Sequence, residues 1–333
     1  MAPAGNYWRL EPPAEVRMAG SVCTVTVSFN SASDIRGLLD SLMAEGIAVS
    51  RVVVVDNAST DGTPEMICRE YPNVSLVRNQ KNMGFAAGAN QGIAACEGEY
   101  VLLVNPDVRF QPGFVGALVA ALDAGPKAGA AAPKLVRPEG GVIDSAGLSM
   151  RKDRKAVDRG SGERDQGQYG SPCRVFGASG AAALLRRAAL EDAAVWGEVF
   201  DESFFAYKED VDLAWRMALL GWEAVYVPGA VGIHARGWKV SSRRRVPRWL
   251  RTRSHANRYL TIIKNDDLPN IIIHLPHVIF LEAKLFIYAV MFEPFLFGAI
   301  RDIIANMRGA LAKRAEIMKR RKLPPADMRR LFG

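Results

Sequence analysis

Asp107 is a side chain whose type and position indicate chemistry. It follows four aliphatic residues, VLLV at 101–104, and then Asn105 and Pro106. An apolar run this short that ends at a proline is typical of a buried strand, and open α/β sheets bind ligands at the carboxyl ends of their strands. Magnesium and manganese accept one or two protein carboxylates together with phosphate oxygens and water. Asp107 is therefore a candidate metal ligand, although a strand-ending Asx-Pro turn explains the three residues equally well.

A second group of carboxylates lies in the sequence EDVD at 209–212, where a helix is expected to begin. Acidic side chains favour a helix N-terminus on electrostatic grounds alone. The preceding aromatic residues, FFAY at 204–207, indicate a partly walled site in which a carboxylate can deprotonate a sugar hydroxyl. On a helix, Glu209 and Asp212 share a face and Asp210 points elsewhere, so we expect only one of Glu209 and Asp210 to face a substrate.

Two more polar side chains stand where a strand is expected to end. Asp56 follows four valines and precedes NASTDG at 57–62, a composition that favours turns. A carboxylate there can accept hydrogen bonds from a base or a ribose. His234 is one of four histidines and lies in a glycine-flanked turn after an apolar strand. A lone histidine is usually structural, and contact with a phosphate or metal is the alternative.

The scaffold for these side chains is predicted from alternating strands and helices over about the first 105 residues. Strands are expected at 22–29, 51–55, 74–77 and 101–104, with a helix after each of the first three and later helices at 114–122 and 209–220. A further strand, 223–227, is expected to close at Pro228 and Gly229. Short connections of this kind predict an α/β fold with a mostly parallel sheet. The dinucleotide fingerprint GxGxxG and the P-loop motif are absent, which argues against both of those nucleotide sites.

Three other stretches carry expectations. Residues 137–172 are rich in Gly, Arg, Asp and Ser and are expected to form a long flexible loop. The small residues of 177–185 allow the backbone to pass close to a ligand. The four cysteines are widely spaced and without a CxxC motif, so we expect buried thiols rather than disulfides or a zinc site. The N-terminal 20 residues form a lead-in without the apolar core of a signal peptide.

The charge is divided unevenly along the chain. Residues 1–235 hold 22 Lys and Arg against 28 Asp and Glu, whereas residues 236–333 hold 21 against 7. A basic tail fits either nucleic acid or an anionic membrane surface. Arginines at 243–245, 248, 251, 253 and 258 are interleaved with aromatic residues, which fits both partners. The acidic first 235 residues argue against nucleic acid.

Two apolar segments, 271–280 and 285–300, follow this basic stretch. Prolines and charges interrupt them, and neither uninterrupted run reaches the roughly 20 residues needed to cross a bilayer. With the basic amphipathic segment 301–330, they predict peripheral (monotopic) attachment to an anionic membrane surface. The alternative is burial in a homodimer interface or against the catalytic domain. We expect residues 241–333 to form this helical region.

Seven segments, in order, resemble the family 2 glycosyltransferases of GT-A fold, within the rhamnosyltransferase-like branch. They are VTVSFNSASDI (25–35), VVVVDNASTDGT (52–63), NQKNMGFAAGANQGI (79–93), GEYVLLVNPDV (98–108), GASGAAALLRR (177–187), FDESFFAYKEDVDLAWRMALLGW (200–222) and VYVPGAVGIHARG (225–237). The resemblance covers about residues 21–240 and implies a GT-A nucleotide-sugar-binding domain there. Asn105 stands at the first acidic position of the family's DxD motif, which implies a metal held more by phosphate than by protein.

The resemblance also implies roles for individual residues. The catalytic base would be Asp210, with Glu209 beside it, and the Mg²⁺ or Mn²⁺ ligands would be Asp107 and His234. The donor side would comprise Phe29, Asn30, Asp56, Asn82, Met83, Gly84, Asn90, Asn105 and Asp107. The acceptor side would comprise Ser179, Gly180 and Trp215.

The reaction implied is an inverting transfer of one sugar, with dTDP-rhamnose as the preferred donor. The acceptor would be a saccharide on a polyprenyl diphosphate, met at the cytoplasmic face of the plasma membrane, with its diphosphate near the arginine cluster. A UDP- or GDP-linked donor, a different acceptor, a nucleotidyltransferase and a nucleic-acid-binding protein are the alternatives. A nucleotidyltransferase usually has a Gly- and Arg/Lys-rich loop after the first strand. This chain lacks such a loop and has Ser28 to Ser31 in its place.

Overall fold

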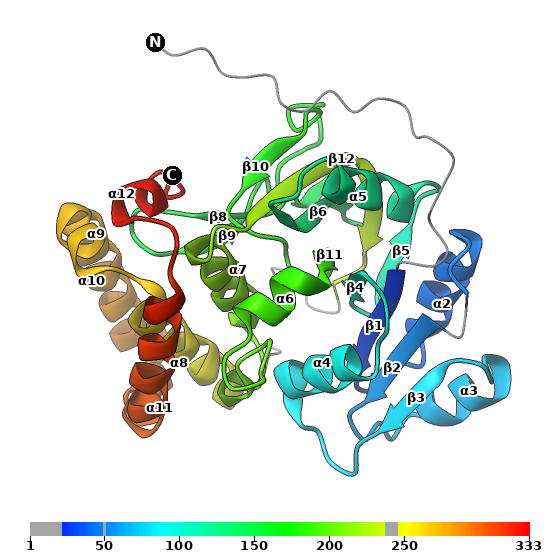
Figure 1. Ribbon diagram of the computed structural model, residues 1–333. Helices are drawn as coiled ribbons and strands as arrows, with labels where there is room; N and C mark the ends of the chain where they lie inside the picture. Colours follow the sequence, from blue (N-terminus) through cyan, green and yellow to red (C-terminus); the bar gives the residue numbers. More distant parts are fainter. Residues whose placement is uncertain (1–21, 49–50, 237–245) are drawn as a thin grey trace.

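The computed structural model describes residues 22–48, 51–236 and 246–333. The expected lead-in, the arginines at 243–245 and the expected boundary at residue 240 lie outside these ranges. The described residues form a mixed α/β domain followed by a group of helices, as the sequence predicted (Figure 1).

The central sheet has the strand order β10-β12-β6-β11-β4-β1-β2-β3. Strands β3, β2, β1 and β4 are parallel neighbours, and β6 and β12 form another parallel pair, while β11 runs antiparallel between β4 and β6. The bounds are β1 Val22–Ser28, β2 Val52–Asp56, β3 Ser75–Arg78, β4 Tyr100–Val104, β5 Val108–Phe110, β6 Ala128–Val136, β7 Ile143–Ser145, β10 Cys173–Val175, β11 Ala182–Arg186 and β12 Glu223–His234. The carboxyl ends of the adjacent strands β1 and β4 therefore meet at one edge of the sheet.

Helices cover both faces of this sheet because successive strand residues point to opposite faces. One buried cluster joins Val54 and Leu102 to α2 (Ile35–Ala44), α3 (Thr63–Glu70) and α5 (Phe114–Asp123). A second joins Val53 and Leu103 to α4 (Gly84–Ala94), α6 (Arg187–Ala193) and α7 (Glu209–Leu219). The alternation in the valine-rich strands thus sets which helices lie on each face.

Two sequence-based expectations about the strands and loops are wrong. Strand β12 does not end at Pro228 but continues to His234 through a register shift between Val227 and Val231. Residues 137–172 are not one flexible loop, because they contain β7 and the hairpin of β8 (Leu148–Met150) and β9 (Ala156–Asp158). Short strands joined by glycine turns leave little periodicity to read in a sequence.

The cysteines also differ from the expectation of buried thiols. Cys23 of β1 and Cys96, just after α4, form a disulfide with their Cα atoms 5.9 Å apart. Their sequence separation of 73 residues gave no hint of this contact, which arises because α4 packs on β1. Cys68 is exposed and Cys173 is half-buried, and both are free thiols.

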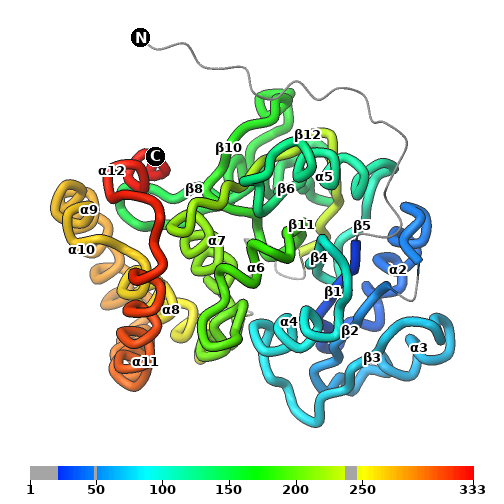
Figure 2. Tube along the Cα trace, in the orientation of Figure 1, coloured from blue at the N-terminus to red at the C-terminus, as the bar shows by residue number. Residues whose placement is uncertain are grey.

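The C-terminal helices pack beside α7, at the end of the molecule opposite β1–β3 (Figures 1 and 2). They are α8 (Arg248–Asn265), α9 (Leu268–Ile273), α10 (Leu275–Phe292), the 3-10 turn η4 (Pro294–Gly298), α11 (Ala299–Arg320) and α12 (Pro325–Arg329). The chain then returns to the α/β domain, where Phe332 forms a bridge with Met150 of β8. This region is therefore continuous with the core rather than a detached tail.

Candidate active site

A cleft of about 690 Å³ opens beyond the carboxyl ends of β1 and β4. Its size is that of a site for a nucleotide-sized ligand. The structure brings nine of the predicted site residues to its wall, from segments up to 200 residues apart in sequence. These nine are Phe29, Asn30, Asn105, Asp107, Ser179, Gly180, Glu209, Asp210 and His234.

His234 lies at the end of β12 between two carboxylates. Its Nδ1 is 2.8 Å from Asp144 Oδ2, and its Nε2 is 3.4 Å from Asp107 Oδ1. Asp144 is itself buried and also pairs with Arg236, so its position is fixed. Burial alone would lower the pKa of His234, but the hydrogen bonds to Asp107 and Asp144 raise it to about 9. The imidazole is thus held in one orientation, with Nε2 toward Asp107.

This pair fits a divalent cation that takes most of its ligands from elsewhere. A carboxylate oxygen and an imidazole nitrogen lie close together, and Asp144 orients the ring in the way that carboxylates orient metal-binding histidines. Within the described ranges, no group of three His, Cys, Asp or Glu side chains forms a complete metal site. Diphosphate oxygens and water would supply the remaining ligands, as magnesium and manganese commonly accept.

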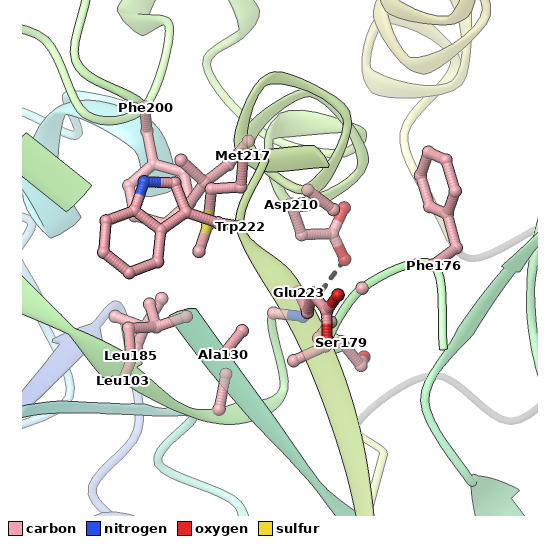
Figure 3. A pocket seen from close by; sticks show the side chains of 17 residues that line it. Leu103, Ala130, Phe176, Ser179, Leu185, Phe200, Asp210, Met217, Trp222 and Glu223 are labelled. Atoms are coloured by element: carbon pink, nitrogen blue, oxygen red, sulfur yellow. Dashed lines mark hydrogen bonds between the residues drawn. The ribbon is translucent and has the colours of Figure 1, made fainter. Parts of the chain in front are cut away.

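Asp210 occupies the first turn of α7 and faces the cleft. Its Oδ2 accepts a hydrogen bond from the backbone N–H of Gly180, with 3.0 Å between the two atoms. Beneath it lies a small apolar pocket of the core, with Asp210 and Ser179 near one end and Leu103, Phe200 and other apolar side chains around the rest (Figure 3). The Asp210 carboxylate is thus fixed on one side and faces the cleft on the other.

The neighbouring acids of α7 have different surroundings. Burial and the charge of Asp210 raise the pKa of Glu209 to about 8, and its Oε2 has no hydrogen-bond partner within the described chain. Asp212 is fully buried and pairs with Arg216 and Lys264. Both Glu209 and Asp210 line the cleft, and the more exposed of the two is Asp210, so the expectation that only one of them faces a substrate stays a prediction.

On the donor side, Asp56 supports the wall of the cleft from behind. Its carboxylate is 1% exposed and accepts hydrogen bonds from the Ser28 hydroxyl and from the Ser59 hydroxyl and backbone N–H. The same Ser59 hydroxyl accepts a hydrogen bond from the backbone N–H of Asn30, which lines the cleft with a positive φ of 51°. Asp56 therefore positions the loop that carries Asn30.

Besides Asp56, five predicted site residues do not line this cleft. Asn82 caps its own turn, and Gly84 begins α4 at a φ of 85°, where a Cβ atom would lie 2.5 Å from Phe205 O. Asn90 uses its amide in hydrogen bonds to the backbone of Phe200. The remaining two are Met83, which is half-buried, and Trp215, which is fully buried between Phe176 and Phe332. Helical periodicity could not distinguish a core tryptophan from one in a site.

The loop before α7 is held in a strained shape by the C-terminal helices. Phe205, Tyr207 and Lys208 all have positive φ, which costs energy for residues other than glycine. Asn257 of α8 is buried, and its side-chain amide donates to the carbonyl oxygens of Phe204, Ala206 and Tyr207 at 2.9–3.1 Å. The C-terminal helices thus set the shape of the segment that presents Asp210.

Asp144, Asp158 and Arg236 were not predicted from the sequence. Asp158 and Arg236 line the cleft, where their side chains are 3.0 Å apart, and Asp144 lies behind His234. The two acids end or interrupt very short strands in a stretch dominated by Gly, Arg and Ser. Their only sequence signal was an apolar residue before each acid, which is too common to identify a site.

Residues 23–193 match the family model described as Glycosyl transferase family 2. An N-acetylglucosaminyl-diphospho-decaprenol L-rhamnosyltransferase from Mycobacterium tuberculosis is 33% identical over 234 residues, which are 63% of this chain and 74% of the relative.

Solved structures are similar in fold. One is the mannosyltransferase PcManGT from Pyrobaculum calidifontis, in complex with GDP-Man and Mn²⁺, with a TM-score of 0.54 and 20% sequence identity. The match covers 94% of this chain and 92% of the mannosyltransferase chain. Another is S. aureus TarS 1-349, in complex with UDP-GlcNAc, with a TM-score of 0.56 and 18% sequence identity, and the match covers 90% of this chain and 89% of the TarS chain. Both likenesses concern the arrangement of the backbone alone.

Proposed function

The chain belongs to glycosyl transferase family 2, and from this premise we propose that it moves one sugar from a nucleoside-diphosphate donor to a saccharide carried on a polyprenyl diphosphate. L-rhamnose from dTDP-rhamnose is the preferred donor sugar, because the 33% identical relative is an L-rhamnosyltransferase that acts on a decaprenyl-diphosphate-linked N-acetylglucosamine. The product would enter a bacterial cell-surface polysaccharide. A UDP- or GDP-linked sugar on another acceptor is the alternative, since structural neighbours bind GDP-Man and UDP-GlcNAc.

One observation supports this proposal above the others. A single cleft contains both a carboxylate able to accept a proton, Asp210, and a carboxylate–imidazole pair suited to a diphosphate-bound cation, Asp107 and His234. A group transfer from a diphosphate needs both functions near one reacting carbon. Phe29 and Asn30, at the end of β1 in the same cleft, would meet the nucleotide.

The residues of the chain would divide the work as follows. Asp210 would take the proton from the acceptor hydroxyl as that oxygen attacks the anomeric carbon. The hydrogen bond from Gly180 would hold the Asp210 carboxylate in place. A direct displacement of this kind inverts the configuration at the anomeric carbon. Asp107 and His234 would hold Mg²⁺ or Mn²⁺, which when bound neutralises charge on the departing diphosphate.

The exterior of the C-terminal helices fits the surface of an anionic membrane. Many large apolar side chains are exposed along this region, and large exposed apolar patches mark sites of membrane or protein binding. They are Leu268, Ile272, Ile273, Leu275, Ile279, Phe280, Phe286, Ile287, Val290, Met291, Phe292, Phe297, Ile300, Ile304 and Leu311. Among the described residues, one helix, Leu275–Phe292, is long and apolar enough to cross a bilayer by length and composition.

Attachments of this helix to the protein favour peripheral binding. Glu282, in the middle of α10, pairs with Arg258 at 2.7 Å and accepts a hydrogen bond from Tyr259 at 2.6 Å. A helix tied to α8 at its centre lies against protein rather than being surrounded by lipid. We therefore propose peripheral attachment, with α10 at the bilayer surface and Arg301, on the next helix, available to anionic headgroups. The cytoplasmic face of the plasma membrane is proposed from the nucleotide-sugar donor and not from these contacts.

A donor screen would test this function. We expect dTDP-rhamnose, incubated with manganese and a polyprenyl-diphosphate-linked N-acetylglucosamine, to yield a disaccharide product detected by mass spectrometry. UDP- and GDP-linked sugars serve as competing donors in the same assay. Product from another donor alone would replace the rhamnosyl assignment, and no product with any nucleotide sugar would refute the proposed acceptor class.

A further inference from the structure

We propose that the isoprenoid diphosphate of the acceptor binds along a defined track beside the catalytic cleft, with its diphosphate in a basic pocket and its hydrocarbon in an apolar groove. The basic pocket is the cavity between α7, α8 and the β8–β9 hairpin, and the apolar groove is the cavity between α8, α10, η4 and α11. This inference rests on the proposed function, because it assigns the place of the lipid carrier.

The three cavities are neighbours that share residues of their walls. The basic pocket, of about 220 Å³, shares the lining residues Ala156, Lys208, Val211 and Ser254 with the catalytic cleft. The apolar groove, of about 370 Å³, shares His255, Leu285 and Leu296 with the basic pocket. A ligand can therefore extend from Asp210 to the exposed face of α10 without leaving a cavity.

The charge of the basic pocket fits a diphosphate. Five cationic side chains and no carboxylate line it, namely Arg154, Lys155, Lys208, Arg251 and Arg258. The three arginines pair with acids, Asp266, Glu293 and Glu282 respectively. Lys155 and Lys208 form no ion pair in the part of the chain that the structure describes, so their charges are available to an anion.

Unused hydrogen-bond donors also gather here. Buried polar atoms normally have partners, and each exception calls for an explanation. Among the described residues, the exceptions include Arg154 Nη2, Arg251 Nε, Arg258 Nε, Trp215 Nε1 and the Thr261 hydroxyl, and all five residues line the basic pocket. A diphosphate offers only acceptor oxygens, and because these atoms are buried, the arginine side chains would have to turn toward the pocket to donate to it.

The apolar groove fits an isoprenoid chain. Leucine, isoleucine, phenylalanine and alanine side chains make up most of its wall, and the groove adjoins the exposed apolar surface of α10 and α11. The order of the three cavities, a cleft with a base, a cationic pocket and an apolar groove, repeats the order of saccharide, diphosphate and hydrocarbon in the acceptor. A nucleotide donor has no hydrocarbon to fill the groove, and a phospholipid headgroup does not require continuity with the cleft.

The test measures binding of farnesyl diphosphate by isothermal titration calorimetry with the full-length protein. We expect the double variant Lys155→Gln, Lys208→Gln to weaken binding at least about tenfold, because two charge-assisted contacts are lost. Ala289→Phe would fill the groove and weaken binding about tenfold. If that variant does not fold, Phe286→Ser alters the same groove at an exposed position and has the same expected direction.

Matched controls are available next to each site. Lys152→Gln removes an exposed lysine outside the pocket, and Val290→Phe adds the same bulk on the outer face of α10, and both should leave farnesyl diphosphate affinity unchanged. Inorganic diphosphate should compete, whereas dTDP with manganese should not. Equal affinity in all variants would overturn the inference, as would competition by dTDP. Loss of phosphatidylglycerol vesicle binding in the lysine double variant would assign the pocket to bilayer headgroups instead.

The two proposals can fail separately. If the protein binds farnesyl diphosphate with this variant pattern but transfers no sugar, the binding track is supported and the proposed function is refuted. If the protein transfers sugar to a polyprenyl-linked acceptor but farnesyl diphosphate affinity is equal in every variant, the proposed function is supported and the binding track is refuted.

Discussion

The Asp210 carboxylate is fixed by the backbone N–H of Gly180, with 3.0 Å between Gly180 N and Asp210 Oδ2. An asparagine at position 210 can accept the same hydrogen bond but cannot accept a proton. We therefore expect Asp210→Asn to lower kcat at least about 100-fold while leaving dTDP affinity unchanged. Steady-state kinetics and calorimetry would measure the two effects, with Asp327→Asn on α12 as the control. Transfer at the wild-type rate would show that another group is the base.

The second prediction concerns the cation at Asp107 and His234. Exhaustive chelation should abolish transfer, and added Mg²⁺ or Mn²⁺ should restore it. Because Asp144 orients His234, Asp144→Asn should raise the cation concentration for half-maximal activity about tenfold or more. Metal titrations of activity would measure this. Full activity after chelation would contradict the assignment of both residues.

Glu209 predicts a pH dependence of stability. Its pKa is about 8 in the folded protein, above the ordinary value of 4.5, so the folded state retains a proton that the unfolded state releases between these values. The contribution of Glu209 is therefore full below about pH 4.5 and is lost as the pH rises toward 8. Glu209→Gln is neutral throughout, so it should gain stability relative to wild type between pH 5 and pH 9, measured by urea unfolding. A difference that does not change with pH would contradict the raised pKa.

Lys264 joins the C-terminal helices to the catalytic domain. Its ammonium group is 1% exposed and lies 2.5 Å from Asp201 Oδ2 and 2.9 Å from Asp212 Oδ1. Lys264→Met leaves two buried carboxylates short of their partner and should cost about 3–5 kcal/mol of unfolding free energy. The exposed Lys284→Met should change it by no more than about 0.5 kcal/mol. Similar unfolding free energies for the two variants would show that the buried pair is dispensable.

Membrane attachment predicts co-sedimentation with anionic liposomes. Replacing Phe280, Ile287 and Met291 together by serine should abolish it, because these side chains are exposed on α10. Met43→Ser, which replaces one exposed apolar side chain on α2 by serine, should have no effect on sedimentation. Truncation after residue 265 is a poorer test, because Phe332 packs against the catalytic domain. Unchanged sedimentation of the triple variant would favour the alternative that this face pairs with another protein.

The sequence by itself determined much of the architecture. Valine-rich runs such as 52–55 alternate between two apolar faces, so the strands, helices and mostly parallel sheet followed from local patterns. Seven ordered segments predicted the glycosyltransferase family and GT-A fold, and the comparisons confirm both. Asp107, Asp210 and His234 were selected from the sequence because each follows or begins a recognisable element, and the structure brings them to one cleft, while their roles stay predictions.

Only the tertiary structure decided which side chains meet. Asp144 contacts His234 across 90 residues of sequence, and Asn257 holds the loop before α7 across about 50. Trp215 was assigned to the acceptor side, yet its place in the core depends on Phe332, at the other end of the chain. Local periodicity determines which face of an element is apolar. Which distant segment covers that face is decided by packing and by the pairing of buried charges, neither of which a single sequence displays.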